Sequence, residues 1–222
     1  MSSELKNELP TLFIGLKRVT AATEGRGHGR TECGKRPLQF TLYAAIATGF
    51  LTSGALEDVF SHCFLVLTWN LMCRANNTTS ICLKHISWRG DALAVIFPRM
   101  KNDQMGERKQ SKHVYANPIM PHVCPILSLA IYYLCFPDIH GPLLYPGHSQ
   151  AERFRKRLHW FLQNHPELGV SSGVDPDDIG THSIRKGALT YCSSGSTSCP
   201  PNMAIRHRAG WSSGVVQDIY CQ

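Results

Sequence analysis

The sequence of 222 residues lacks paired cysteines, and this absence excludes a disulfide-built fold. Its nine cysteines are scattered singly, with no C-x-x-C pair. Several lie in apolar runs, such as Cys63 in SHCFLVLTW and Cys135 in YYLCF. A free thiol in such a run behaves as a small hydrophobic side chain. We therefore expect free cysteines and a reducing compartment.

Clustered metal ligands are also scarce. No group of carboxylates is visible that would hold Mg²⁺. One set of possible zinc ligands consists of Cys192, Cys199 and His207, but the spacing of these residues matches no common zinc finger. We expect neither a metal nor a small-molecule cofactor.

Long apolar runs and a secretory leader are absent as well. The opening MSSELKNELP is polar, without the apolar centre of a leader peptide. The longest apolar stretch, around residues 60–72, contains Ser61, His62 and Asn70 and is too short to span a bilayer. The sequence therefore predicts a soluble protein with no membrane partner.

Acidic residues are fewer than basic ones. The chain has 23 Lys and Arg against 16 Asp and Glu, which gives a formal charge of +7 and a pI near 9.0. This balance favours a polyanionic partner, although many proteins without one carry a similar charge. The length suffices for one large domain with its own core.

The first third of the chain divides into an entry segment and two helices. Residues 1–36 are predicted to hold a short helix and a Gly-rich basic linker, TEGRGHGRTECGKRP. A helix over PLQFTLYAAIATGFLTSG would end at Gly54. A second, over ALEDVFSHCFLVLTWNLMCRA, would present Arg74 at its end, before Asn76 and Asn77 break it. Arg74 there either serves a site or only offsets the helix dipole.

A three-stranded β-meander is predicted next. HISW, ALAVIF and SKHVYANP are typical strands, and the polar loop PRMKNDQMGERKQ separates the second from the third. Lys101 would lie near the tip of that loop, where a flexible lysine is usually solvated surface. Basic neighbours of Lys101, among them Arg99 and Lys112, are candidate contacts to the phosphates of a polyanionic partner.

Two more helices follow, and the second carries a basic face. ILSLAIYYLCF predicts a short buried helix. AERFRKRLHWFLQNH predicts a helix with Phe154, Leu158 and Phe161 or Leu162 on one side. The basic residues on its other faces either contact DNA or form a solvated surface. They are Arg153, Arg155, Lys156 and Arg157.

The stretch from Thr181 to Tyr220 holds the residues that could bind and cleave a phosphate ester. His182 and Arg185 are three residues apart, so on a helix they share a face and can reach one phosphate together. Trp211 follows a glycine, and Tyr220 lies nine residues beyond it. Cationic neighbours would favour the phenolate of Tyr220 and make it a nucleophile. Lys186 and Arg206 complete the predicted DNA contacts.

The ordered set of Arg, Lys, His-x-x-Arg, Trp and Tyr resembles the signature of the tyrosine recombinases, or phage-integrase family, whose catalytic core is shared with type IB topoisomerases. The resemblance implies a mainly helical α+β catalytic core with a small antiparallel β-meander over residues 37–222. It also implies cleavage of double-stranded DNA through a 3′-phosphotyrosine link, by a homo-oligomer on DNA. The catalytic residues would be Arg74, Lys101, His182, Arg185, Trp211 and Tyr220.

In the same resemblance Tyr220 attacks the phosphate, and Arg74, Arg185 and His182 stabilise the charge on its oxygens. Lys101 protonates the departing 5′ oxygen, and Trp211 bonds or packs near the phosphate or the tyrosine helix. HSIRKGALTYCSSG and IRHRAGWSSGVVQDIY are similar to recombinases of eukaryotic mobile elements, which suggests the nucleus, or otherwise the cytoplasm.

The chain departs from the family pattern at both ends. Residues 1–36 are too short for the core-binding domain that usually precedes the catalytic one, and only Cys221 and Gln222 follow Tyr220. Two alternatives therefore stay open. One is an inactive DNA-binding remnant of a mobile-element recombinase, and the other is a nicking and rejoining enzyme like the type IB topoisomerases.

Overall fold

The computed structural model describes residues 14, 19, 35–97, 111–194 and 199–210. The chain separates into two compact units, Met1–Gly34 and Lys35–Gln222. Of the first unit only Ile14 and Val19 are described, and both are helical with exposed side chains. The division falls near the predicted end of the entry segment at residue 36, whose nature as a linker stays a prediction.

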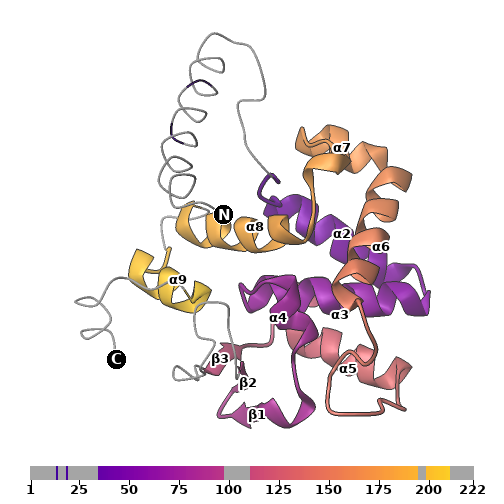
Figure 1. Ribbon diagram of the computed structural model, residues 1–222, viewed down its shortest axis with the longest axis vertical. Coiled ribbons are helices and arrows are strands. Elements are labelled where there is room, and N and C mark those ends of the chain that lie inside the picture. The colour runs from indigo at the N-terminus through magenta and orange to yellow at the C-terminus, as the bar shows by residue number, and fades with distance from the viewer. Residues whose placement is uncertain (1–13, 15–18, 20–34, 98–110, 195–198, 211–222) are drawn as a thin grey trace, which may run out of the picture. The chain divides into compact units, whose positions relative to one another are not determined.

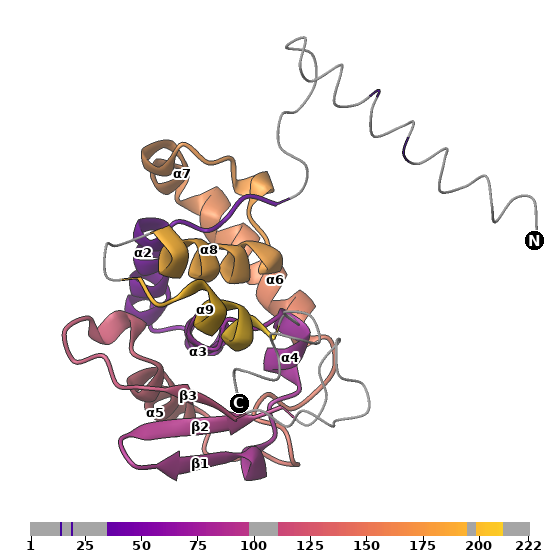
Figure 2. The same cartoon turned by 90° about the vertical axis from the view of Figure 1, so that its left-hand side faces the viewer.

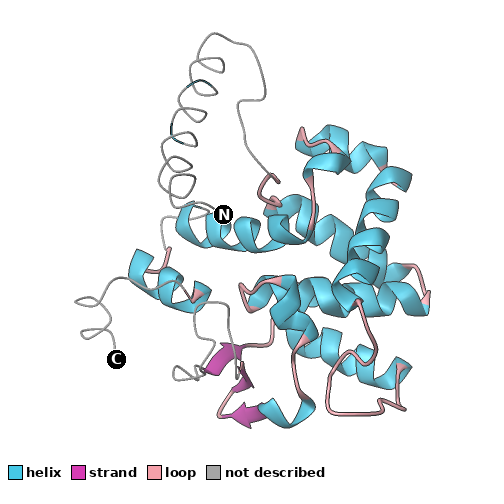
Figure 3. Cartoon of the chain, in the orientation of Figure 1, coloured by secondary structure: helices cyan, strands magenta, loops and turns pink. Residues whose placement is uncertain are grey.

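Helices make up most of the second unit (Figures 1 and 3). They are α2 (Phe40–Thr52), α3 (Leu56–Asn70), α4 (Ala75–Thr79), α5 (Pro125–Cys135), α6 (Gln150–Asn164), α7 (Pro166–Ser172), α8 (Thr181–Ser194) and α9 (Asn202–Ala209). Short 3₁₀ turns, η1 (Leu83–His85), η2 (Pro121–Val123) and η3 (Pro176–Asp178), precede β1, α5 and α8.

A small antiparallel sheet lies at one side of the helical body (Figure 2). Its strands are β1 (Ile86–Arg89), β2 (Ala92–Ile96) and β3 (Ser111–Val114), in the order β1-β2-β3. Ala94 pairs with Ser87 on one side and with His113 on the other. The mainly helical α+β architecture with a β-meander is thereby confirmed.

Helix α3 is the centre of the core. It contacts α2, α5, α6 and α8, and most of its side chains are buried. Phe64 stacks on Phe154 of α6 with ring centroids 4.7 Å apart, and Tyr145 lies against both Phe60 and Phe64. The longest apolar stretch of the sequence is therefore a core helix. None of the helices within the described residues is long and apolar enough to cross a membrane.

The segment that enters α2 lies directly against α8. The backbone N–H of Leu38 donates to the Ser183 carbonyl at 2.9 Å. A Cβ added at Gly187 would collide with the Leu38 carbonyl, so only glycine allows this approach. This contact places the helix that carries His182 and Arg185 over α2 and α3.

The predicted end of the second helix is wrong. The sequence extended it to Arg74, but α3 ends at Asn70 and Met72 adopts a positive φ of 48°. Arg74 is the N-cap of α4, a helix that the sequence did not predict. Buried Thr78 explains the turn, because its hydroxyl lies 2.9 Å from the Thr68 hydroxyl and 3.2 Å from the Cys73 thiol. These side-chain hydrogen bonds favour the fold-back over continued helix.

Candidate functional site

Two arginines predicted from distant parts of the sequence come together. Arg74 lies at the start of α4, and Arg185 lies on α8 with 7% of its surface exposed. Burial lowers the pKa of Arg185, and the positive charge of Arg74 lowers it further. Arg74 is thus close enough for its charge to act on Arg185, as a shared phosphate would require.

The neighbouring helix α9 is held by the same residue. Arg185 donates a hydrogen bond from its Nη2 to the carbonyl of Ala209 at 2.7 Å. Ala209 is the last residue of α9, and Gly210 ends the helix with a φ of 70°. Arg185 therefore links α8 directly to the residue pair that precedes Trp211.

Lys112 adds a third cation to this region. It lies on β3 with 4% of its surface exposed, and its Nζ donates to the Leu71 carbonyl at 2.9 Å. Burial lowers its pKa to about 8, and the charges of Arg185, Arg208 and Arg74 act in the same direction. The sequence placed Lys112 among surface phosphate contacts. The structure buries it instead, because the side chain points inward from β3 to the end of α3.

Arg208 is a fourth cation, which sequence reasoning did not single out. Its Nη2 donates to the Asn70 carbonyl at 2.8 Å and to the His113 carbonyl at 2.7 Å. It thereby fastens α9 to the end of α3 and to β3. The available signal was its position three residues after buried Ile205, on the inward face of the helix.

His182 and Lys186 lie on α8 with exposed side chains. His182 is one turn before Arg185, as its spacing predicts. The Lys186 ammonium donates to the Lys35 carbonyl at 2.7 Å, so it holds the start of the second unit, just before α2. Arg206 on α9 is exposed to solvent.

Four of the predicted site residues lie outside the described residues. They are Arg99, Lys101, Trp211 and Tyr220. The first two belong to the segment between β2 and β3, and the other two follow Gly210. Their roles stay predictions.

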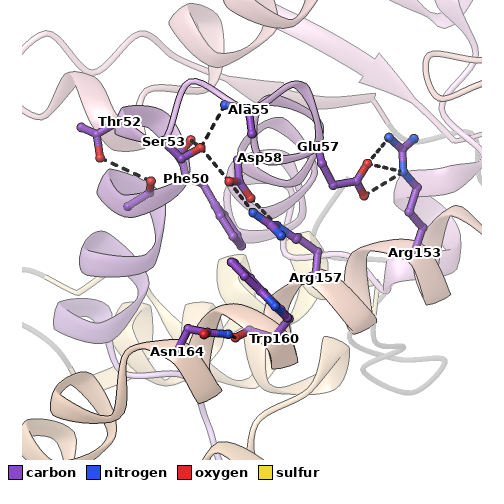
Figure 4. Close-up of polar contacts among 11 residues, drawn as sticks. Phe50, Thr52, Ser53, Ala55, Glu57, Asp58, Arg153, Arg157, Trp160 and Asn164 are labelled. Atoms are coloured by element: carbon purple, nitrogen blue, oxygen red, sulfur yellow. Dashed lines mark hydrogen bonds and ion pairs between the residues drawn. The ribbon is translucent and has the colours of Figure 1, made fainter.

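Two of the four predicted basic contacts on α6 hold that helix on α3 (Figure 4). Arg157 donates two hydrogen bonds, of 2.6 and 2.7 Å, to the carboxylate of buried Asp58. The guanidinium of Arg157 also lies over the ring of Trp160. Arg153 bonds Glu57 from its Nε at 2.9 Å. Arg155 pairs with Glu152 on its own helix, and Lys156 is exposed. Arg155 and Lys156 are therefore better placed to face a solvent-side partner.

The chemistry available to this region is anion binding. Arginine presents a planar fork of donors that fits two phosphate oxygens, and buried positive charges stabilise negative charge that develops on them. In the described part of the chain, no three His, Cys, Asp or Glu side chains gather as metal ligands, and Cys192, Cys199 and His207 form no such group. All seven described cysteines are free thiols.

Comparisons with solved structures match this arrangement of helices and strands. One neighbour is the XerH site-specific recombinase bound to palindromic difH substrate in a post-cleavage complex, with a TM-score of 0.55 and 11% identity. It is matched over 84% of this chain and 49% of its own length. Another is the FLP recombinase in a Holliday junction complex, with a TM-score of 0.58 and 8% identity over 100% of this chain and 55% of its own.

The chain has the fold of the tyrosine recombinases. It spans about half the length of these two recombinases. No protein-family model matches the sequence, and no curated protein sequence matches it either. The tyrosine recombinase fold is therefore recognised from the arrangement of the backbone. The sequence identity is too low to assign the activity of these recombinases to this chain.

Proposed function

We propose that this chain is the catalytic domain of a tyrosine recombinase that cleaves and rejoins strands of double-stranded DNA. The observation that carries the proposal is that Arg74 acts on buried Arg185, which is bonded to the end of α9. The resemblance to tyrosine recombinases implied that these two arginines share one phosphate. Their approach in a recombinase-like fold supports that role.

The chemistry proposed is transesterification at a DNA phosphate. The Tyr220 oxygen attacks phosphorus and forms a 3′-phosphotyrosine bond, while the bond to the 5′ oxygen breaks. Lys101 gives that oxygen its proton, and Arg74, Arg185 and His182 stabilise the charge on the phosphoryl oxygens. Trp211 bonds or packs beside the phosphate or the tyrosine helix. Attack by a 5′ hydroxyl reverses the step, so no nucleotide is consumed.

The proposal also covers the oligomeric state, the biological role and the location of the protein. Exchange of strands between two DNA sites requires several copies of the enzyme on DNA, so we include a homo-oligomer. The sequence resemblance to recombinases of eukaryotic mobile elements motivates a role in integration of such an element and a nuclear location. The positive net charge of +7 is consistent with a DNA partner.

Covalent trapping tests the proposal. The protein is incubated with a pool of nicked duplexes from which the cleaved end diffuses away, and a denaturant-resistant protein–DNA adduct is sought. We expect an adduct with the natural sequence and none with Tyr220→Phe. DNA binding without an adduct on any substrate would contradict the proposed activity and favour a DNA-binding remnant. Relaxation of any supercoiled plasmid would favour a topoisomerase instead.

A further inference from the structure

In the described part of the chain, the buried ammonium of Lys112 has no carboxylate partner. Its one hydrogen bond among the described residues is to the Leu71 carbonyl, and no ion pair joins it there. Its ring contact is Phe97, whose centroid lies 5.5 Å from Nζ. By contrast, buried Asp58 on α3 has its cationic partner, Arg157. Among the described residues, Asp58 thus has an oppositely charged partner and Lys112 has none.

Such an arrangement is costly in the absence of an anion. A buried charge is tolerated when it is paired, and without a partner it loses its proton more readily. The positive charges of Arg74, Arg185 and Arg208 further disfavour the protonated form of Lys112 and lower its pKa. Among the described residues, the Cys73 thiol is a further titratable neighbour, and burial raises its pKa, so it stays neutral near pH 7.

We propose that Lys112 is a positioning residue of the phosphate site, where its buried ammonium adds charge behind Arg74 and Arg185. Its hydrogen bond to Leu71 also fixes the turn between α3 and α4 that presents Arg74. This inference rests on the proposed function, because the anion it serves is the phosphate that the two arginines bind. An anion entering the site would bring negative charge close to Lys112.

A dependence on pH follows from this role. The pKa of Lys112 in the folded protein is about 8, below its ordinary value of 10.5, so the charge is present at pH 6.5 and largely lost at pH 9.5. Arginine side chains remain charged in proteins over this range, so they do not contribute to the change. Anion affinity should therefore decrease between these two pH values, and Lys112 should account for the decrease.

The probe is inorganic sulfate, whose charge does not change over this range. Sulfate is titrated against the thermal unfolding of the full chain under reducing conditions, and its apparent affinity is read from the rise in Tm. For the natural protein we expect an affinity about tenfold higher at pH 6.5 than at pH 9.5. Lys112→Met should bind sulfate at the weaker level at both pH values. Lys84→Met, which alters an exposed lysine on η1, should behave like the natural protein.

Folding of Lys112→Met is checked by the same unfolding curves without sulfate. Between pH 8 and 10.5 the folded natural protein binds fewer protons than the unfolded chain, so its stability relative to Lys112→Met should rise with pH. A stability difference that stays constant with pH would show that Lys112 is only a packing residue, and would overturn the proposal.

Arg74→Gln separates this inference from the proposed function. If Arg74→Gln weakens sulfate binding while Lys112→Met leaves both the affinity and its pH dependence unchanged, the role of Lys112 is refuted and the phosphate site stands. If sulfate does not stabilise the natural protein, or does so equally in Arg74→Gln, the phosphate site itself is refuted.

Discussion

Arg185 on α8 donates a hydrogen bond to the carbonyl of Ala209 on α9, over 2.7 Å. This bond ties the helix that carries the His-x-x-Arg motif to the residue that precedes Gly210 and Trp211. A side chain predicted to bind phosphate thus also holds the end of α9.

Arg185→Lys should lower DNA cleavage by about 100-fold or more, because removal of a single donor from such a site commonly has that effect. A lysine has no planar fork with which to serve both the Ala209 carbonyl and a phosphate. The rate of adduct formation in the trapping assay measures the effect, with Arg89→Lys, at the exposed end of β1, as the matched control. An unchanged rate in Arg185→Lys would contradict the assignment.

Gly187→Ala should destabilise the protein by about 2–3 kcal/mol, because the added methyl group collides with the Leu38 backbone and overpacking has costs of this order. Urea unfolding measures the change. Thr190→Ala, at an exposed position of the same helix, should change stability by less than about 0.5 kcal/mol. Equal stability of the two variants would show that α8 can move away from Leu38 freely.

Asp58→Asn should lower the free energy of unfolding by about 3 kcal/mol at pH 7, the order found when one partner of a buried ion pair is removed. Burial by itself raises the pKa of Asp58, but hydrogen bonds from Arg157 and Ser53 outweigh it and lower the pKa below 3.8. The stabilisation is thus present above pH 3.8 and is lost as the pH falls through the lower value of the folded state.

Urea unfolding of Asp58→Asn and the natural protein from pH 7 down to the acid limit of folding checks this dependence. The difference between them should shrink in acid. Glu152→Gln removes the exposed ion pair with Arg155 and should have little effect at any pH. A difference that persists unchanged in acid would mean that Asp58 contributes through packing rather than charge.

Substitution of Arg155 and Lys156 by alanine should weaken DNA binding in a salt-dependent manner. Removal of each side chain that binds a phosphate should reduce the slope of log affinity against log salt by about one. Arg157→Ala should mainly reduce stability, because its guanidinium is bound to Asp58. The affinity of each variant for a DNA duplex is measured at several salt concentrations, and Lys84→Ala serves as the control. An unaltered slope in the double variant would exclude this face of α6 from DNA binding.

The architecture could be predicted well where local periodicity carries the signal. The apolar face of α6, with Phe154 and Leu158, is buried as its spacing predicts. The three strands lie in the stretches predicted from their β-branched and aromatic content. The end of α3 could not be predicted in this way. Its propensity for helix continues past Asn70, and tertiary contacts end it, among them the hydrogen bonds of buried Thr78 to Thr68 and Cys73.

The sequence by itself determined the order of the elements and the spacing of His182 and Arg185 on one helix, because both follow from interactions within a few residues. The tertiary structure decided which cations serve a site. Arg153 and Arg157 find carboxylates 96 and 99 residues away, whereas Lys112 is turned inward from β3 toward Arg74 and Arg185. The sequence does not show which group a charged side chain will contact, because that contact depends on packing between segments that are distant along the chain.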